Sequence, residues 1–290
     1  MNNSKEGDGN HLGHTLSSMM NELTIERIGP MSLANAEKNL PHIREGQSVL
    51  DLQNTELMEG DSALIIAAGP SIHRFDTARM IKESEFDGVI ITTESAMTWC
   101  LKNDIRPDLV ITVDPHPDRI VRWFGDPDLT EAALAKDDYF ERQEMDPDLR
   151  RDQIAFNERA LALINEHGPN MRIATSSSAS DAVMRRVRET GMRAYWWNPF
   201  FDDYDLPDSI TRQIHKANRL PCLNAGGNVG TASWVMAHAV LEKTKIGLLG
   251  LDLGYYGDTT YRETQYYTEL VELFGEDKLA DIFVHVHNPY

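Results

Sequence analysis

Six short apolar runs, each closed by glycine or by a polar residue, constrain the fold of this chain more than any other feature. Helical patterns separate several of them. Continuous apolar strands that alternate with helices are typical of a parallel sheet covered on both faces. The pattern therefore predicts an α/β fold with a doubly wound, mostly parallel sheet. The runs occupy residues 63–67, 88–92, 109–113, 171–175, 193–197 and 245–251.

The chain divides into three parts by composition. Residues 1–16 are rich in Asn, Gly, Ser and His, which predicts a disordered leader. Residues 17–60 carry apolar positions at helical spacing, and we expect a helical lead-in that Pro41 interrupts. Residues 61–290 then form a Rossmann-like domain.

A charged helical insertion interrupts that domain at about 118–168, and it is too long for an ordinary connection. It is either a lid over the site or a solvated helical excursion without a role. Near the end of the chain, residues 282–287 alternate like a strand. Either this segment is an edge strand or further residues belong beyond it.

Charge and cysteine content exclude several classes of protein. With 28 Lys and Arg against 46 Asp and Glu, the net charge is −18, which repels a phosphodiester backbone and argues against a nucleic-acid partner. Cys100 and Cys222 are too few for a disulfide framework and lack metal-ligand spacing. Neither a signal peptide nor an apolar membrane span is recognisable. We expect a cytoplasmic protein.

In doubly wound sheets, ligands bind beyond the carboxyl ends of the strands. The first such end carries Gly69, Pro70 and Ser71, where glycine permits close approach of a ligand and amides at a helix start could hold phosphate. A plain turn explains this tripeptide equally well. The second end carries Thr93, Glu94 and Ser95, whose polar groups could meet a ribose or a base, or could simply cap a helix.

The third end places Asp114 and His116 in a loop stiffened by two prolines. The carboxylate could bind a metal or a sugar hydroxyl, and the histidine could move a proton near neutral pH. A purely structural loop is the alternative.

The fourth candidate is a glycine-rich segment before the apolar helical stretch 232–241. First-turn amides lack intrahelical partners and favour an anion, so this segment predicts an anion cradle. Glycines needed only for close helix packing are the alternative. The cradle residues are Gly226, Gly227, Asn228 and Gly230.

Asp252 follows the last strong strand, and tyrosines 255, 256 and 261 come soon after it. Tyrosine hydroxyls can donate to a phosphate without adding a positive charge. Because the chain is strongly acidic, we expect amides and neutral donors to hold the anion, with Mg²⁺ recruited by Asp114 or Asp252.

These residues resemble the MptE-like family (domain of unknown function 115), which includes Maf glycosyltransferases and archaeal 6-hydroxymethylpterin diphosphokinases. The resemblance spans roughly 57–261 and rests on an ordered set of short motifs. They are Ala67-Ala68-Gly69-Pro70-Ser71, Ile105-Arg106-Pro107-Asp108, Val113-Asp114-Pro115, Gly250-Leu251-Asp252-Leu253 and Thr260-Tyr261.

The resemblance implies two activities. Maf proteins are thought to transfer a nonulosonic acid from a CMP donor to flagellin hydroxyls, and they are similar to bacterial sialyltransferases. That implies CMP held by the Gly69 turn and the glycine-rich helix start, phosphate contacts from Tyr261 and from Tyr255 or Tyr256, and a general base at His285 or His287. The diphosphokinases instead move pyrophosphate from ATP with Mg²⁺, but their Asp-Leu-Asp-Gly strand end is Val-Asp-Pro-His here.

Three hypotheses follow. The first is a glycosyltransferase that uses a CMP-activated, sialic-acid-like donor and a hydroxyl acceptor, such as one on a protein like flagellin. The second is the ATP- and Mg²⁺-dependent diphosphokinase. The third is a nucleotide-binding module without catalytic activity. In the first, Asp114, His116, Asp252, Tyr256, Tyr261 and His287 carry the chemistry.

Overall fold

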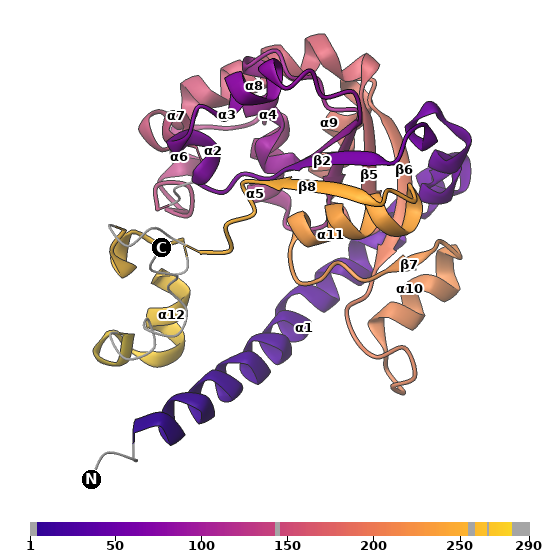
Figure 1. The fold of residues 1–290 in the computed structure, drawn as a ribbon. Helices are drawn as coiled ribbons and strands as arrows, with labels where there is room; N and C mark the ends of the chain where they lie inside the picture. The colour runs from indigo at the N-terminus through magenta and orange to yellow at the C-terminus, as the bar shows by residue number, and fades with distance from the viewer. Residues whose placement is uncertain (1–4, 143–145, 255–258, 266, 280–290) are drawn as a thin grey trace.

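The computed structural model describes residues 5–142, 146–254, 259–265 and 267–279. These residues form an eight-stranded sheet with the order β1-β6-β5-β4-β3-β2-β8, and β7 pairs with β6 beside that path (Figure 1). Every strand pair is parallel. The strands are β1 (Gln47–Ser48), β2 (Ser62–Ile66), β3 (Val89–Thr93), β4 (Leu109–Thr112), β5 (Arg172–Ser176), β6 (Arg193–Pro199), β7 (Cys222–Leu223) and β8 (Lys245–Leu249).

The predicted α/β class is confirmed, and the six apolar runs correspond to β2, β3, β4, β5, β6 and β8. The sequence did not indicate β1 and β7, because two residues are too few to show a pattern.

The helical segments are α1 (Lys5–Glu45), η1 (Val49–Asn54), η2 (Glu56–Met58), α2 (Ser71–Arg74), α3 (Thr77–Glu83), α4 (Glu94–Lys102), α5 (Pro117–Ile120), η3 (Val121–Phe124), α6 (Glu131–Leu134), α7 (Pro147–Arg151), α8 (Gln153–His167), η4 (Gly168–Asn170), α9 (Asp181–Glu189), α10 (Ile210–Asn218), α11 (Val229–Val235), η5 (Met236–Val240), η6 (Tyr261–Glu263), α12 (Tyr267–Phe274) and η7 (Glu276–Lys278).

From β3 to β6 both faces of the sheet are buried, which explains why these strands are apolar without alternation, whereas the edge strand β8 is partly exposed. In β4, Val110 packs in the cluster formed with α4, η3, α8 and α9. Its neighbours Leu109 and Ile111 pack in the opposite cluster, with η1, α11 and η5. The two layers cover the sheet from opposite sides, as Figure 1 shows for α8 and α11.

Helix α1 is longer than the sequence predicted. It includes residues 5–16, the expected leader, and it passes Pro41 without ending. Beyond Pro41, burial of Ile43 in the core holds the last turn in place. Among the residues that the structure describes, no helix is long and apolar enough to cross a membrane.

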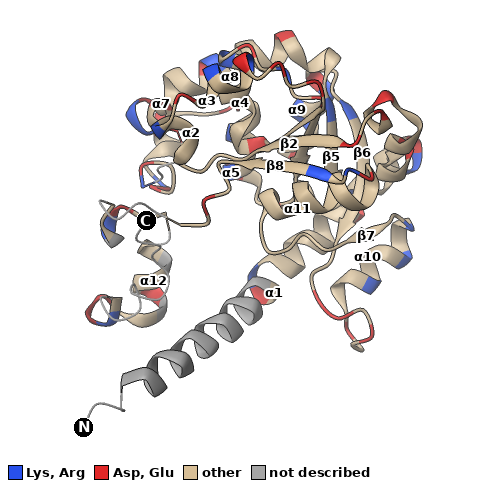
Figure 2. Ribbon diagram, in the orientation of Figure 1, with Lys and Arg blue, Asp and Glu red and all other residues tan. Residues whose placement is uncertain are grey.

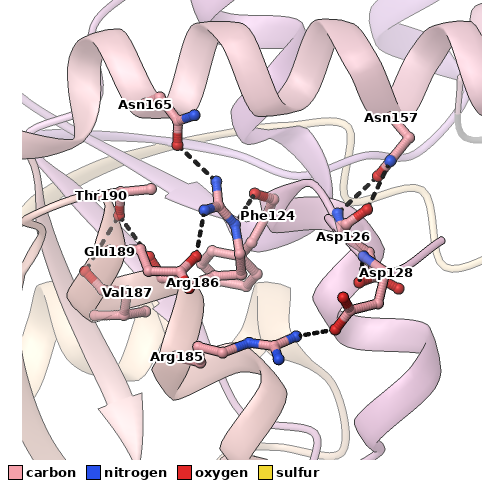
Figure 3. Close-up of polar contacts among 10 residues, drawn as sticks. All are labelled: Phe124, Asp126, Asp128, Asn157, Asn165, Arg185, Arg186, Val187, Glu189 and Thr190. Carbon is pink, nitrogen blue, oxygen red and sulfur yellow. Dashed lines mark hydrogen bonds and ion pairs between the residues drawn. The ribbon is translucent and has the colours of Figure 1, made fainter.

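The range of the predicted insertion, 118–168, contains α6, α7 and α8, and α8 is a layer of the fold. Its Phe156, Ala160 and Ile164 are buried against α4 and the sheet, so α8 is not a lid. The buried Arg186 of α9 ties the insertion down by donating to the Phe124 carbonyl at 3.3 Å and to Asn165 Oδ1 at 2.8 Å (Figure 3).

Two further contacts hold the same region in place (Figure 3). Asn157 accepts from the Asp126 amide at 2.7 Å and donates to the Asp126 carbonyl at 2.8 Å. Arg185 of α9 forms an ion pair with Asp128 at 2.6 Å. The loop between η3 and α6 is therefore attached both to α8 and to α9.

Candidate functional site at the carboxyl edge of the sheet

The order of strands in the sheet changes direction at β2. Strands β3, β4, β5 and β6 are added one after another on one side of β2, whereas β8 pairs with β2 on its other side. In an open α/β sheet, such a switch point leaves a crevice at the carboxyl ends of the two strands. The residues that follow β2 and β8 therefore define where a ligand is expected.

The turn after β2 is bonded directly to the segment after β8. Ser71 donates its backbone N–H to Asp252 Oδ2 at 2.8 Å and its hydroxyl to Asp252 Oδ1 at 2.7 Å. The Gly69 amide donates to the Gly250 carbonyl at 2.7 Å. A Cβ at position 69 would lie 2.6 Å from Asp252 Oδ2, so glycine is needed for this close approach.

This contact changes the predicted role of the turn. The Ser71 amide, expected to be free for phosphate, is occupied by a carboxylate of the chain itself. The next two amides are bonded within the turn, since Ile72 donates to the Gly69 carbonyl and His73 to the Pro70 carbonyl. The turn thus joins the ends of β2 and β8 through hydrogen bonds. A phosphate would reach the Ser71 amide only by displacing Asp252.

The glycine-rich segment, by contrast, keeps amides that are not bonded. Asn228 caps α11 by accepting from the Thr231 amide at 2.9 Å, and the Thr231 hydroxyl accepts from the Asn228 amide at 3.3 Å. Gly226 and Gly227 have φ values of +65° and +89°, which favour glycine. Within the described residues, no protein acceptor is bonded to the amides of 227, 229 or 230. This segment remains the best candidate for an anion cradle.

The glycine-rich segment lies against the segment that follows β8. A Cβ at Gly230 would overlap the Leu251 side chain, so the first turn of α11 touches the segment that contains Asp252. Helix α11 also packs on β2, β3 and β4. The structure thereby brings Ser71, Asp252 and Gly230 into one continuous site.

The ends of β3 and β4 add a second group of polar residues. Thr93 and Ser95 share a hydrogen bond of 3.1 Å between their hydroxyls, and the Thr93 side chain does not cap α4 although it occupies the N-cap position. Glu94 begins α4 and is only 4% exposed. Burial, opposed by its own backbone N–H and reinforced by the charge of Asp114, raises the pKa of Glu94 to about 8.

His116 follows the end of β4, and its side chain caps the start of α5 through hydrogen bonds. Its Nδ1 accepts from the amides of Asp118 and Arg119, each at 3.2 Å, at the start of α5. Burial is the main cause that lowers the pKa of His116, so the neutral ring predominates near pH 7. Because Nδ1 is an acceptor, the hydrogen-bond network assigns the proton to Nε2. His116 can therefore donate to a ligand, and the neutral ring is not poised as a base.

Helix α1 closes the carboxyl edge beside these loops, a role that the sequence did not reveal. Asn39 donates to the carbonyls of Ser177 and Ala179 at 2.9 and 2.8 Å. One turn earlier, Asn35 donates to the carbonyls of Pro115 and Ser178 at 3.1 and 3.0 Å. The two asparagines lie on one face at the i and i+4 positions, which was the signal available in the sequence. They attach α1 to the loops that follow β4 and β5, at the same edge of the sheet as Ser71 and Asp252.

The remaining predicted residues are placed as follows. Tyr256 and His287, like Tyr255 and His285, lie outside the described residues, as does the predicted strand at 282–287. Tyr261 is the first residue of η6, which neighbours the insertion because Arg142 donates to the Arg262 carbonyl. Their predicted roles stay predictions.

Charge at the site is acidic. The segments at the site, residues 67–71, 93–95, 113–117, 224–230 and 250–254, contain three carboxylates, Glu94, Asp114 and Asp252, and no Lys or Arg. Figure 2 shows that, elsewhere, basic residues lie on α7 and acidic residues in the loop before α10. Beside Ser71 and Asp252 lies a groove of about 620 Å³ with an apolar wall that includes Phe75, Met80 and Leu248.

The predicted Mg²⁺ ligands do not fit a dedicated metal site. Both oxygens of Asp252 accept from Ser71, and Asp114 Oδ1 accepts from the His116 amide at 2.7 Å. Among the described residues, no group of three or more His, Cys, Asp or Glu could hold a metal ion. We therefore assign no step to a resident cation.

The fold and this carboxyl-edge crevice define an α/β protein of the doubly wound class. Residues 34–134 match the model of the family described as 6-hydroxymethylpterin diphosphokinase MptE-like, which confirms the predicted resemblance for that part of the chain. The matched part contains the turn after β2 and the ends of β3 and β4, whereas Gly230 and Asp252 lie beyond it.

Among solved structures, one similar chain is a Maf glycosyltransferase from Magnetospirillum magneticum AMB-1, with 18% sequence identity and a TM-score of 0.41. The match covers 69% of this chain and 24% of that chain, so this protein corresponds to only part of that enzyme's length. A search of curated proteins found no match.

Proposed function

We propose that this protein is a transferase that binds a nucleotide-activated substrate at the carboxyl edge of its sheet, between the ends of β2, β3 and β8 and the start of α11. The observation that carries the proposal is the convergence of the MptE-like turn, Asp252 and the open amides of α11 at the switch point. In a doubly wound sheet this is where nucleotides bind.

The donor that we propose is a CMP-activated nonulosonic sugar. The site offers backbone amides and the His116 Nε2–H, but its loops contain three carboxylates and no Lys or Arg. Such a site suits the single phosphodiester of a CMP-sugar better than the highly charged triphosphate of ATP. The amides of 229 and 230 would hold the phosphate, and the hydroxyls of Thr93 and Ser95 at the end of β3 would serve the nucleoside.

The proposed reaction transfers the sugar to a hydroxyl. The bond between the anomeric carbon and the phosphate oxygen breaks, and CMP leaves with the electron pair. The acceptor oxygen forms the new bond and loses its proton to a base. Amides that face the phosphate stabilise the charge that develops on the leaving group. We propose that Tyr256 and Tyr261 assist that departure and that His287 is the base, with a protein hydroxyl such as one on flagellin as an acceptor.

One observation favours a second candidate, a 6-hydroxymethylpterin diphosphokinase, because that activity names the family whose model matches residues 34–134. This enzyme would move pyrophosphate from ATP, with Mg²⁺ arriving bound to the nucleotide. The loop Val113-Asp114-Pro115-His116 argues against it, because a single carboxylate ends β4 there.

Titration calorimetry with CMP, and separately with ATP and Mg²⁺, tests the two candidates. Saturable binding of CMP supports the glycosyltransferase, and binding of ATP and Mg²⁺ alone supports the kinase. Release of AMP on addition of 6-hydroxymethyldihydropterin would establish the kinase. Binding of CMP-sugars without turnover across a panel of acceptors would indicate a nucleotide-binding module that is not catalytic.

A further inference from the structure

Strand β8 forms one edge of the sheet. It pairs with β2, and within the described residues no strand pairs with its other side (Figure 1). Open strand edges usually carry a proline, a bulge or charged side chains that prevent pairing with another chain. Residues 246–249 contain no proline and no charged residue, and Lys245 at the start of the strand forms an ion pair with Asp61. Nothing in this stretch of β8 therefore prevents pairing with a further strand.

Two residues of β8 direct their backbone groups away from β2. Lys245 donates its amide to a carbonyl just before β2 at 3.0 Å, and the Leu249 carbonyl accepts from an amide just after β2 at 2.8 Å. In a strand, the N–H and C=O of one residue point to one side and those of the next residue to the other. Lys245, Gly247 and Leu249 thus face β2. Ile246 and Leu248 each present one donor and one acceptor at the outer edge.

Large apolar side chains flank this edge on both layers of the fold. On one layer, Phe75 and Met80 are 64% and 59% exposed, and with Leu248 they line the groove of about 620 Å³. On the other layer, Trp234 of α11 is 43% exposed. It lies one turn beyond Gly230 on the helix face that meets the segment after β8. Exposed apolar surface on this scale is typical of protein–protein interfaces.

We propose that the outer edge of β8 pairs with β8 of a second copy of this chain, antiparallel across a two-fold axis that passes beside Gly247. In this register Ile246 of each copy lies opposite Leu248 of the other, and each such pair exchanges both of its N–H···O bonds. Gly247 lies opposite its own copy, where two strands approach to about 4.5 Å between Cα atoms and glycine adds no side chain. Lys245 lies opposite Leu249, so no two lysines face each other.

A second copy fits this edge because the edge is complementary to itself. A two-fold interface uses the same surface on both subunits. With the axis beside Gly247, every outward donor and acceptor of β8 finds a partner. An axis perpendicular to the sheet also places each layer beside the same layer of the second copy. Phe75 and Met80 then gather with their copies on one layer, and Trp234 does so on the other.

The proposed dimer does not depend on the proposed function. Paired antiparallel strands carry their carboxyl ends in opposite directions, so the two candidate sites lie at opposite ends of the joined sheet. Asp252 stays bonded to Ser71 in each copy, because the new bonds involve only the outer edge of β8. Oligomeric state therefore tests the dimer without any ligand.

Sedimentation velocity of the full chain from about 1 to about 100 µM tests the pairing, and we expect a reversible monomer–dimer equilibrium. Leu248→Pro removes an outward N–H and keeps the bonds to β2, so the dimer dissociation constant should rise by about a hundredfold or more. Leu248→Thr keeps the N–H and should raise that constant by about tenfold at most. Leu206→Thr, at an exposed leucine in the loop before α10, should leave the constant unchanged.

Two exposed positions keep the test decisive if Leu248→Pro does not fold. Phe75→Glu and Met80→Glu place a charge beside its own copy across the axis, so each should weaken the dimer by about tenfold. Circular dichroism checks that the variants keep the fold.

Salt and hydrogen exchange supply independent readouts. Each copy carries a net charge of −18, so added salt should strengthen a dimer held by backbone bonds and apolar contacts. The amides of Ile246 and Leu248 should exchange more slowly as protein concentration rises. A chain that stays monomeric at the highest concentration overturns the proposal. So does a dimer that salt weakens or that the Leu248, Phe75 and Met80 variants leave intact, and so does a monomer whose β8 pairs only with a different protein.

Discussion

Ser71 and Asp252 are 181 positions apart in the sequence, yet both donors of Ser71 bond the two oxygens of one carboxylate. This double contact joins the first turn of the sheet to the segment after its last strand. It also replaces the phosphate that the Ser71 amide was expected to bind. The contact is thus both a structural bond across the switch point and one wall of the candidate site.

Loss of the Asp252 carboxylate should destabilise the protein. Asp252→Ala leaves the Ser71 amide and hydroxyl without acceptors, so we expect the free energy of unfolding to fall by about 1–3 kcal/mol. Ser71→Ala should cost less, because the amide bond to Asp252 remains. Urea unfolding of both single variants and of the double variant gives the coupling energy. Strictly additive effects would contradict the double contact.

Gly69 should not tolerate a side chain. In Gly69→Ala the new Cβ collides with the Gly250 backbone carbonyl, so we expect a loss of about 2 kcal/mol or more in the free energy of unfolding. Gly247→Ala is the matched control in β8, since its Cβ meets the flexible end of Leu64 at 3.1 Å and the Ala63 carbonyl only at 4.0 Å. Thermal unfolding of the two variants measures the difference. Equal stability of the two would show that the turn can move away from β8.

A side chain at position 230 should affect CMP binding more than it affects the stability of the fold. Its Cβ would overlap the end of the Leu251 side chain, which can rotate, but the first turn of α11 would shift. We expect Gly230→Ala to weaken CMP binding by about tenfold, or about 1.4 kcal/mol. Leu251→Ala in the same chain should restore much of the affinity by making room. Failure of the double variant to recover would mean that the α11 amides do not hold the phosphate.

The α1 asparagines should differ in their contribution to stability. Asn39 is buried, and Asn39→Ala leaves the carbonyls of Ser177 and Ala179 without this donor, so we expect a loss of about 2–3 kcal/mol. Asn35 is only partly buried, and water can replace its amide in Asn35→Ala, so a smaller loss is expected. Urea unfolding monitored by tryptophan fluorescence compares them. The reverse order would contradict the burial argument.

Stability should depend on pH through Glu94. Its pKa rises from the usual 4.5 to about 8 on folding, so between these values the folded state binds more protons than the unfolded state. This group therefore stabilises the protein fully below about pH 4.5, and its contribution is lost as the pH rises toward 8. Glu94→Gln should become progressively more stable than the natural chain over that range in urea unfolding. A difference that is constant with pH would show that Glu94 is ionised in the fold.

The strands were predictable because burial on both faces leaves a continuous apolar run, which a local stretch of sequence displays directly. The ends of these apolar runs mark the strand ends, so the sequence also identified Ser71, Glu94, Asp114 and Asp252 as candidate site residues. The continuation of α1 past Pro41 was not predictable, because it is held by burial of Ile43 in the core and by the bonds of Asn39 to a distant loop. Neither β1 nor β7 is long enough to show a pattern.

By itself, the sequence determined the class of fold, the positions of the strand ends and the acidic character of the loops, because all three follow from local composition and periodicity. Only the tertiary structure decided which strand ends are neighbours. The sheet order brings β8 beside β2, so Asp252 reaches Ser71, and the packing of α4 buries Glu94 at the end of β3. Those contacts join residues far apart in the chain, and the free energy that selects them comes from packing both faces of the sheet at once.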